Sequence, residues 1–349
     1  MKQLIAVLVA TIALPMFPAK ATTVGLFSPL SYSPSPGFTS VPGEYTLDSD
    51  ALRMTGPAGY SANGVLDRGV AVFTFSDFLL GSDARITTTG TLPVAILSQS
   101  QMTISGNGIR ALAGGGAGGE PRERGEGLGG GFPGFNFFGG AGGGGGFGGA
   151  GGRGQFDNPT FSFPGQGGPA YGDLSVALQG GSGGGGGKDN TGFESAGGDG
   201  GGGIELGALG QLLITAGINA DGLPGQPRGS NHAAGGGGSG GGIRLHATSV
   251  TINSFVSADG GAGGDGVFEN GGGGGGGRIL IQTGPAGLSA LGSISVDGGL
   301  SPSDFFGSGT PGDPGVITIR AIPEPTTIVI AGLLFAPLGA KRGRRSHLR

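Results

Sequence analysis

Three passages in the C-terminal half of the chain repeat one pattern, and this repeat limits the folds open to it. Each passage begins with a glycine run, continues through two short stretches rich in β-branched and aliphatic residues, and ends in Asp-Gly. The aspartates Asp221, Asp259 and Asp297 are separated by 38 residues and again by 38. A fixed period of this length is typical of repeat architectures, in which one unit buries its apolar face only against its neighbours.

Apolar side chains alternate within each passage, as they do along a β-strand. The pairs that share a face are Ile204 with Leu206, Ile243 with Leu245, and Ile279 with Ile281. In each unit a further aliphatic residue stands three positions before the aspartate: Ile218, Val256 and Ile294. We therefore expect an all-β fold, a parallel β-solenoid resembling a β-helix, with long glycine-rich loops. A stacked β-sandwich is the alternative.

Composition changes along the chain and divides it into five segments. Glycine supplies 89 of the 349 residues, far above the usual ~7%. The centre alternates glycine runs with phenylalanine. It is predicted either to dock on the strands through its phenylalanines or to be a disordered spacer. We expect a signal peptide at 1–21, an N-terminal β region and cap at 22–112, a glycine/phenylalanine-rich insert at 113–202, the repeat solenoid at 203–320 and a sorting segment at 321–349.

The N-terminus has the layout of a secretory signal peptide. Lys2 precedes a mostly apolar stretch over 4–17, and Ala19 and Ala21 form an A-x-A cleavage site. The apolar stretch is too short for a permanent membrane anchor, and two prolines disfavour a long helix there. We expect the mature chain to be exported.

The C-terminus combines a short polar motif, an apolar run and a basic end. Pro323, Glu324 and Pro325 precede an apolar run over 326–340, and the basic residues that stop transfer are Lys341, Arg342, Arg344 and Arg345. As a helix, 15 residues extend about 22 Å, short of the ~30 Å hydrocarbon core. We therefore expect a short transmembrane helix that holds the chain transiently, with its basic end in the cytoplasm.

This three-part order resembles the PEP-CTERM sorting domain of Gram-negative bacteria. The resemblance implies an exosortase-type enzyme that recognises Pro323, Glu324 and Pro325 and cuts near them, and clients that accompany exopolysaccharide. It also implies export across the inner membrane to the cell envelope, the cell surface or the medium. An ordinary tail anchor is the other interpretation. More weakly, the rhythm of residues 103–109 resembles glycine-rich bacterial surface proteins with β-helices.

Charge and cysteine content exclude several classes of function. The chain has no cysteine, so disulfides, thiol nucleophiles and thiolate metal sites are absent. Residues 22–322 carry 12 Lys and Arg against 22 Asp and Glu, a net charge of −10. Such a chain lacks the basic footprint that nucleic-acid binding needs. We expect no cofactor.

Glycine-rich sequence also produces matches to functional motifs by chance. Residues 180–184 and 237–241 fit G-x-S-x-G, but neither lies between a strand and a helix. Residues 260–268 fit a calcium-binding nonapeptide, of which there is one clean copy, whereas such sites need tandem copies. We expect no catalytic residue and no metal site.

These features predict a non-catalytic structural protein of the cell surface or the exopolysaccharide matrix, binding exopolysaccharide or copies of itself. The alternative is a polysaccharide lyase or hydrolase with a β-helix fold. Its candidate residues, Glu205 and Arg244, are expected to stack on adjacent strands as an ion pair on the solvent face. His246 is likewise expected to face solvent.

Overall fold

The computed structural model describes residues 27–134, 140–155, 163–188, 194–227, 233–266, 269–304 and 307–321. All of them belong to one compact unit, residues 22–322. The described part is all-β and contains no α-helix; its only helical turns are two 3₁₀ turns, η1 (Pro29–Ser31) and η2 (Pro57–Gly59). Within it, no helix has the length and apolar character needed to cross a membrane. The expected transmembrane helix at 326–340 lies outside the described residues.

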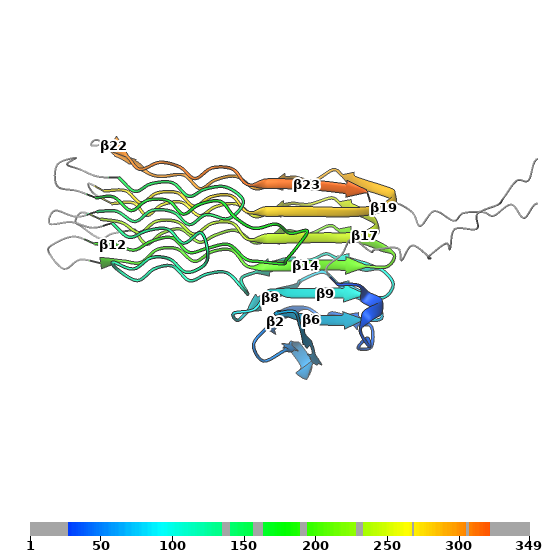
Figure 1. Ribbon diagram of the computed structural model, residues 1–349. Coiled ribbons are helices and arrows are strands. Elements are labelled where there is room, and N and C mark those ends of the chain that lie inside the picture. The colour runs from blue at the N-terminus through cyan, green and yellow to red at the C-terminus, as the bar shows by residue number, and fades with distance from the viewer. Residues whose placement is uncertain are drawn as a thin grey trace, which may run out of the picture. The chain divides into compact units, whose positions relative to one another are not determined.

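Most strands belong to two sheets of parallel neighbours. In the first sheet, one series of strands runs β6 (Val70–Phe75), β9 (Val94–Ser98), β14 (Gly203–Ala208), β17 (Gly242–Ile252), β19 (Arg278–Ala290) and β23 (Val316–Ala321). These strands lie one above another (Figure 1). A second series in the same sheet comprises β1 (Phe38–Thr39), β7 (Phe78–Leu80), β10 (Met102–Ile104) and β15 (Gln211–Ile214), and β15 continues onto the C-terminal half of β17.

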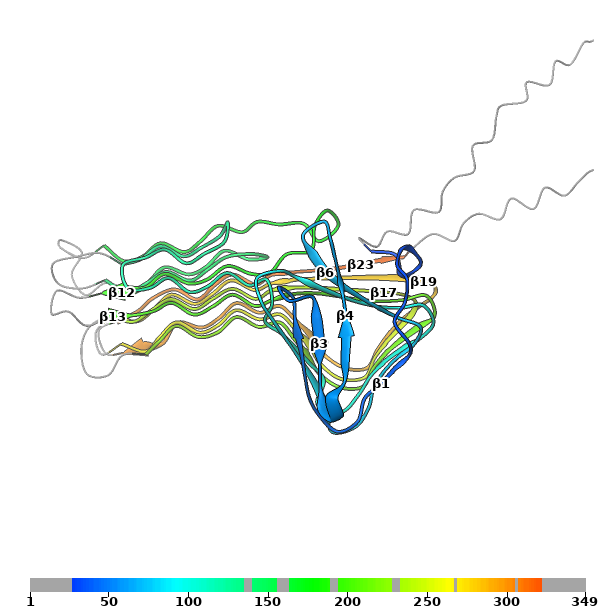
Figure 2. The same cartoon turned by 90° about the horizontal axis from the view of Figure 1, so that it is seen from below.

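The second sheet forms another face of the same stack. Its parallel strands are β2 (Gly43–Asp48), β8 (Ala84–Thr89), β11 (Ile109–Ala111), β16 (Ile218–Asn219), β18 (Val256–Ser257) and β20 (Ile294–Ser295). Seen along the stack, the strands and turns have a triangular outline (Figure 2).

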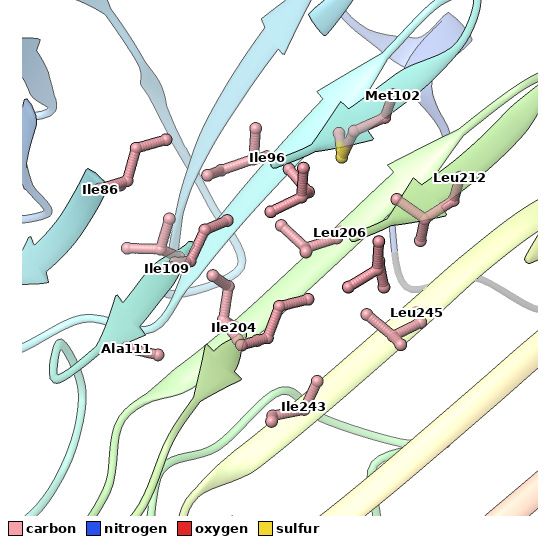
Figure 3. Packing of buried hydrophobic residues seen from close by; sticks show 14 of the residues in the cluster. Ile86, Ile96, Met102, Ile109, Ala111, Ile204, Leu206, Leu212, Ile243 and Leu245 are labelled. Atoms are coloured by element: carbon pink, nitrogen blue, oxygen red, sulfur yellow. The ribbon is translucent and has the colours of Figure 1, made fainter. Parts of the chain in front are cut away.

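The repeating aliphatic residues align in register and fill the space between the faces. Ile204 pairs with Ile243, and Ile243 with Ile279, while Leu206, Leu245 and Ile281 align in the same way. All six are at most 1% exposed. The side chains of Ile204, Leu206, Ile243 and Leu245 lie in one cluster with those of Ile109, Met102 and Leu212 from other strands (Figure 3). The predicted alternation is therefore confirmed, and each repeat buries its apolar face against the next.

The N-terminal end of the stack is closed by antiparallel strands. β3 (Arg53–Thr55) pairs with β2 and β4 (Ser61–Asn63), and β5 (Val65–Asp67) pairs with β6. β3 and β4 lie across the triangular outline (Figure 2). Met54 of β3 is fully buried, and the Tyr60 ring packs edge-on against Phe38. An antiparallel hairpin here covers apolar side chains that the first parallel strands would expose.

Tyr60 makes this end sensitive to alkali. Burial raises the pKa of Tyr60 to about 12, from an ordinary value of 10.0. The folded protein therefore favours the neutral phenol of Tyr60. The contribution of this phenol to the free energy of unfolding is complete below pH 10 and is lost as pH rises toward about 12. We expect the urea midpoint of unfolding to fall over this interval, and less steeply in Tyr60→Phe. Tyr32, whose pKa is also raised to about 12, and Tyr171, whose pKa is raised by burial, contribute the remaining slope. Equal slopes in the two proteins would contradict this.

The glycine runs extend to one side of the strands (Figures 1 and 2). Short hairpins lie among them: β12 (Gly187–Lys188) with β13 (Glu194–Ser195), and β21 (Ser303–Asp304) with β22 (Gly307–Ser308). The segment 171–178 forms no strand and contains a turn at 174–176. Asp173 sets this turn, because its carboxylate accepts hydrogen bonds from the backbone and hydroxyl of Ser175.

Candidate functional site: a buried ionic cluster and a glycine bundle

The predicted sorting and cleavage residues lie outside the described residues. This holds for Ala19 and Ala21, for the motif Pro323, Glu324 and Pro325, and for the basic residues Lys341, Arg342, Arg344 and Arg345. Two features of the described part bear on function: a cluster of buried ionisable side chains, and the packing of the glycine runs.

The ionic cluster comes from three adjacent strands. Glu205 on β14 lies beside Arg244 on β17, and His246 lies two residues further along β17. Glu205 Oε1 is 2.9 Å from His246 Nε2 and accepts a hydrogen bond from the Phe27 backbone, while its Oε2 is 4.0 Å from Arg244 Nε. Arg244 also donates to the Leu174 carbonyl at 3.1 Å and to Gln282 Oε1 on β19 at 2.9 Å. The expected pairing across neighbouring strands is present.

Its expected location on the solvent face is wrong. Glu205 is 0% exposed, Arg244 1% and His246 7%. This outer face is covered by a second apolar cluster: Phe27, Val70, Val72, Ala95, Leu97, Phe147, Leu174, Leu178 and Leu280. Burial lowers the pKa of Arg244, and the neighbouring Glu205 opposes this shift.

The cluster has no room for a sugar chain, because its atoms bond one another and the segments that cover them. A glycosidase needs two carboxyl groups facing a shared substrate. Here a single carboxylate faces a guanidinium and an imidazole, all beneath Phe27 and Leu174. In the described residues, no group of three or more His, Asp or Glu side chains is arranged to hold a metal ion. The arrangement is suited to fixing the covering segments onto the sheet.

The glycine runs are not free loops; they form a hydrogen-bonded bundle. In the run 271–277, every third N–H donates to the same neighbouring segment. Gly271, Gly274 and Gly277 donate to 264, 261 and 258, residues 272 and 275 to 142 and 145, and residues 273 and 276 to 310 and 313. A three-residue repeat is the period of the polyproline II helix, which has no internal hydrogen bonds. The run 271–277 therefore bonds to neighbours on three sides.

Close packing in this bundle requires glycine. A Cβ on Gly274 would lie 2.0 Å from the Gly238 carbonyl oxygen, and one on Gly236 would lie 2.0 Å from that of Gly143. Residues 141–149, 181–187, 233–242 and 271–277 are all buried. Much of the insert 113–202, for which docking and disorder were both open, is thus ordered within the described residues. Backbone hydrogen bonds connect it to the neighbouring glycine runs.

The repeated aspartates connect one repeat to the next. Asp221 Oδ1 accepts a hydrogen bond from the Asp259 backbone at 2.7 Å, and Asp259 Oδ1 accepts one from the Asp297 backbone at 2.7 Å. Ser257 and Ser295 donate to these carboxylates as well. The carboxylates of Asp221 and Asp259 thus each bond the following repeat. This ladder gives the 38-residue spacing its physical basis.

A scan against protein-family models, a search of curated proteins and a search of solved structures each returned no match.

Proposed function

We propose that this chain is a non-catalytic, exported structural protein of the cell surface or the exopolysaccharide matrix. The observation that supports this most is the glycine bundle, in which the runs bond one another through backbone groups alone. Such a body gains rigidity without disulfides, which a cysteine-free exported chain needs. The ionisable groups that a sugar-cleaving alternative would use are enclosed in the ionic cluster.

For the architecture we propose a parallel β-solenoid, in which each repeat makes one turn around the core. Support comes from the register, since residues 38 positions apart, such as Ile218 and Val256, pair on neighbouring strands. A solenoid also explains why the two sheets share one apolar core. It places the glycine bundle beside the stack as a lateral extension of successive turns.

For its route we propose export across the inner membrane of a Gram-negative bacterium, followed by sorting at the C-terminus. The signal peptide would be removed after Ala21, and the segment 326–340 would hold the chain in the membrane until an exosortase-type enzyme acts. The final location is the cell envelope, the cell surface or the medium. Exopolysaccharide and further copies of the chain are the proposed partners there.

Sorting is tested by changing the motif. Replacing Pro323, Glu324 and Pro325 with alanine should leave the protein in the inner-membrane fraction at its unprocessed size, because the processing enzyme loses its recognition element. Fractionation and immunoblotting measure this, and Thr327→Ala beside the motif is the matched control. Release of the triple variant at the wild-type rate would refute the sorting proposal.

A further inference from the structure

A groove crosses the outer face of the second sheet and is separate from the ionic cluster and the glycine bundle. Ile86, Ile109, Ile218 and Val256 are buried and in register, and the residues that precede them are Arg85, Gly108, Gly217 and Phe255. Arg85, Gly217 and Phe255 line the groove, whereas Gly108 has a φ of +73°, so that an added Cβ there would meet the Gly217 carbonyl oxygen at 2.0 Å. The strands that carry Arg85 and Phe255 are three strand spacings apart, or about 14 Å, and the Phe255 ring extends back toward Gly217.

The groove is a hollow of about 400 Å³ whose lining includes Arg85, Asn107, Arg110, Asn219, Asp221 and Phe255. The Phe255 ring lies over Gly217, where an added Cβ would come within 2.1 Å of it. The ring is nonetheless 48% exposed. An aromatic ring that is open to solvent beside polar groups offers a flat apolar surface to a ligand.

The charged groups in the groove differ in how many partners they have within the protein. The Asp221 carboxylate accepts hydrogen bonds from Asn219, from the Ser257 hydroxyl and from the Asp259 backbone. Arg110, on the neighbouring strand, forms no ion pair with any described residue. Arg85 is 4.0 Å from Glu44, and both side chains are largely exposed. The groove thus presents the guanidinium donors of two arginines. Asp221 neutralises their charge only in part, because its carboxylate is engaged in the aspartate ladder.

We propose that this groove binds a carboxylate-bearing segment of an acidic polysaccharide. Arg110 and Arg85 would bond the sugar carboxylate, since the planar guanidinium matches carboxylate geometry. Phe255 offers a flat apolar surface for one face of the sugar ring, and the amides of Asn107 and Asn219 offer donors and acceptors for hydroxyls. The inference rests on the proposed function in assigning the matrix polysaccharide as the partner.

The surroundings restrict the occupant. Beyond Asp221 the same face continues into Asp259 and Asp297, and residues 22–322 carry a net charge of −10. Contact with a polyanion is therefore favoured at the arginine end and disfavoured beyond it, and a neutral sugar offers the two guanidinium groups no charge to pair with. The groove favours a short anionic stretch at the arginine end.

The test is calorimetric titration of the purified full-length chain with a short oligogalacturonate, and with a neutral cello-oligosaccharide of the same length. We expect binding of the oligogalacturonate only, weakened about tenfold by Arg110→Gln and about tenfold by Phe255→Ala. Arg53→Gln, at an exposed arginine of the N-terminal cap, should bind as the wild type does. Unchanged thermal midpoints of the variants would show that the fold is intact.

Equal affinity for the neutral sugar, no binding of the oligogalacturonate, or no loss in Arg110→Gln would each overturn the groove proposal. None of these results affects the sorting experiment, which depends on residues 323–325. Normal release of the sorting variant with intact oligogalacturonate binding would instead refute the sorting route and leave the groove standing.

Discussion

Replacing Gly274 with alanine should destabilise the glycine bundle by about 3 kcal/mol or more. The new methyl group would lie 2.0 Å from the Gly238 carbonyl oxygen, which belongs to the backbone of the facing run and cannot rotate away. Overpacking alone costs about 1–3 kcal/mol. Displacing the run also strains hydrogen bonds from Gly274 to Gly261 and from Gly238 to Leu223, each worth about 1 kcal/mol. Urea unfolding and amide hydrogen exchange over 258–277 measure the loss.

Gly81→Ala is the matched control. An added Cβ at Gly81 would meet nothing closer than the Ser40 hydroxyl at 3.5 Å, and the residue does not have a positive φ. We expect a change within about 0.5 kcal/mol, as for most substitutions away from tight packing. If Gly274→Ala were as mild as Gly81→Ala, with unchanged exchange rates, the close-packed bundle would be refuted.

Glu205→Gln should lower the free energy of unfolding by about 3 kcal/mol. The substitution keeps the shape of the side chain but removes the charge that faces Arg244, which is 1% exposed. Removing one partner of a buried ion pair costs about 3–5 kcal/mol, because the other charge stays buried without compensation. The loss should be visible as a lower urea midpoint at unchanged slope.

Two further variants separate charge burial from a general loss of packing. Glu44→Gln removes one side of the exposed pair with Arg85 and should cost less than about 1 kcal/mol. Adding Arg244→Met to Glu205→Gln removes the uncompensated guanidinium and should recover part of the stability. Strictly additive losses in the double variant would show that the two charges are not coupled.

The all-β class and the core were predictable because both follow from local patterns. The alternation of Ile204 with Leu206 identifies the inward face of one strand, and the 38-residue spacing places its equivalents Ile243 and Ile279 directly beside it. The alternation and the spacing both predict the structure directly, because a strand turns alternate residues to opposite faces.

The outer faces were harder, because alternation does not say what covers a face. Glu205 and Arg244 read as solvent-facing, yet residues far away in the sequence, Phe27 and Leu174, enclose them. Nothing local predicts that contact. The groove was also missed, because it depends on the register that brings Ile86, Ile109 and Val256 onto neighbouring strands.

The order of the glycine runs could not be read from composition. A run such as 271–277 has no side chains to show a preferred face, and isolated glycine chains lose much entropy on ordering. Each run is ordered by backbone hydrogen bonds to the parallel and antiparallel runs beside it. Those neighbouring runs are brought within reach by the strands, so the order depends on the whole fold.

The three-residue repeat of the bundle also constrains how such a chain can change length. Removing one residue from a run turns all later amides by a third of a revolution, so that each would face the wrong neighbour. Removing three restores every direction and shortens the run by one full turn, about 9 Å. Insertions and deletions tolerated within these runs should therefore come in multiples of three residues, because the direction of the backbone amides repeats every three residues.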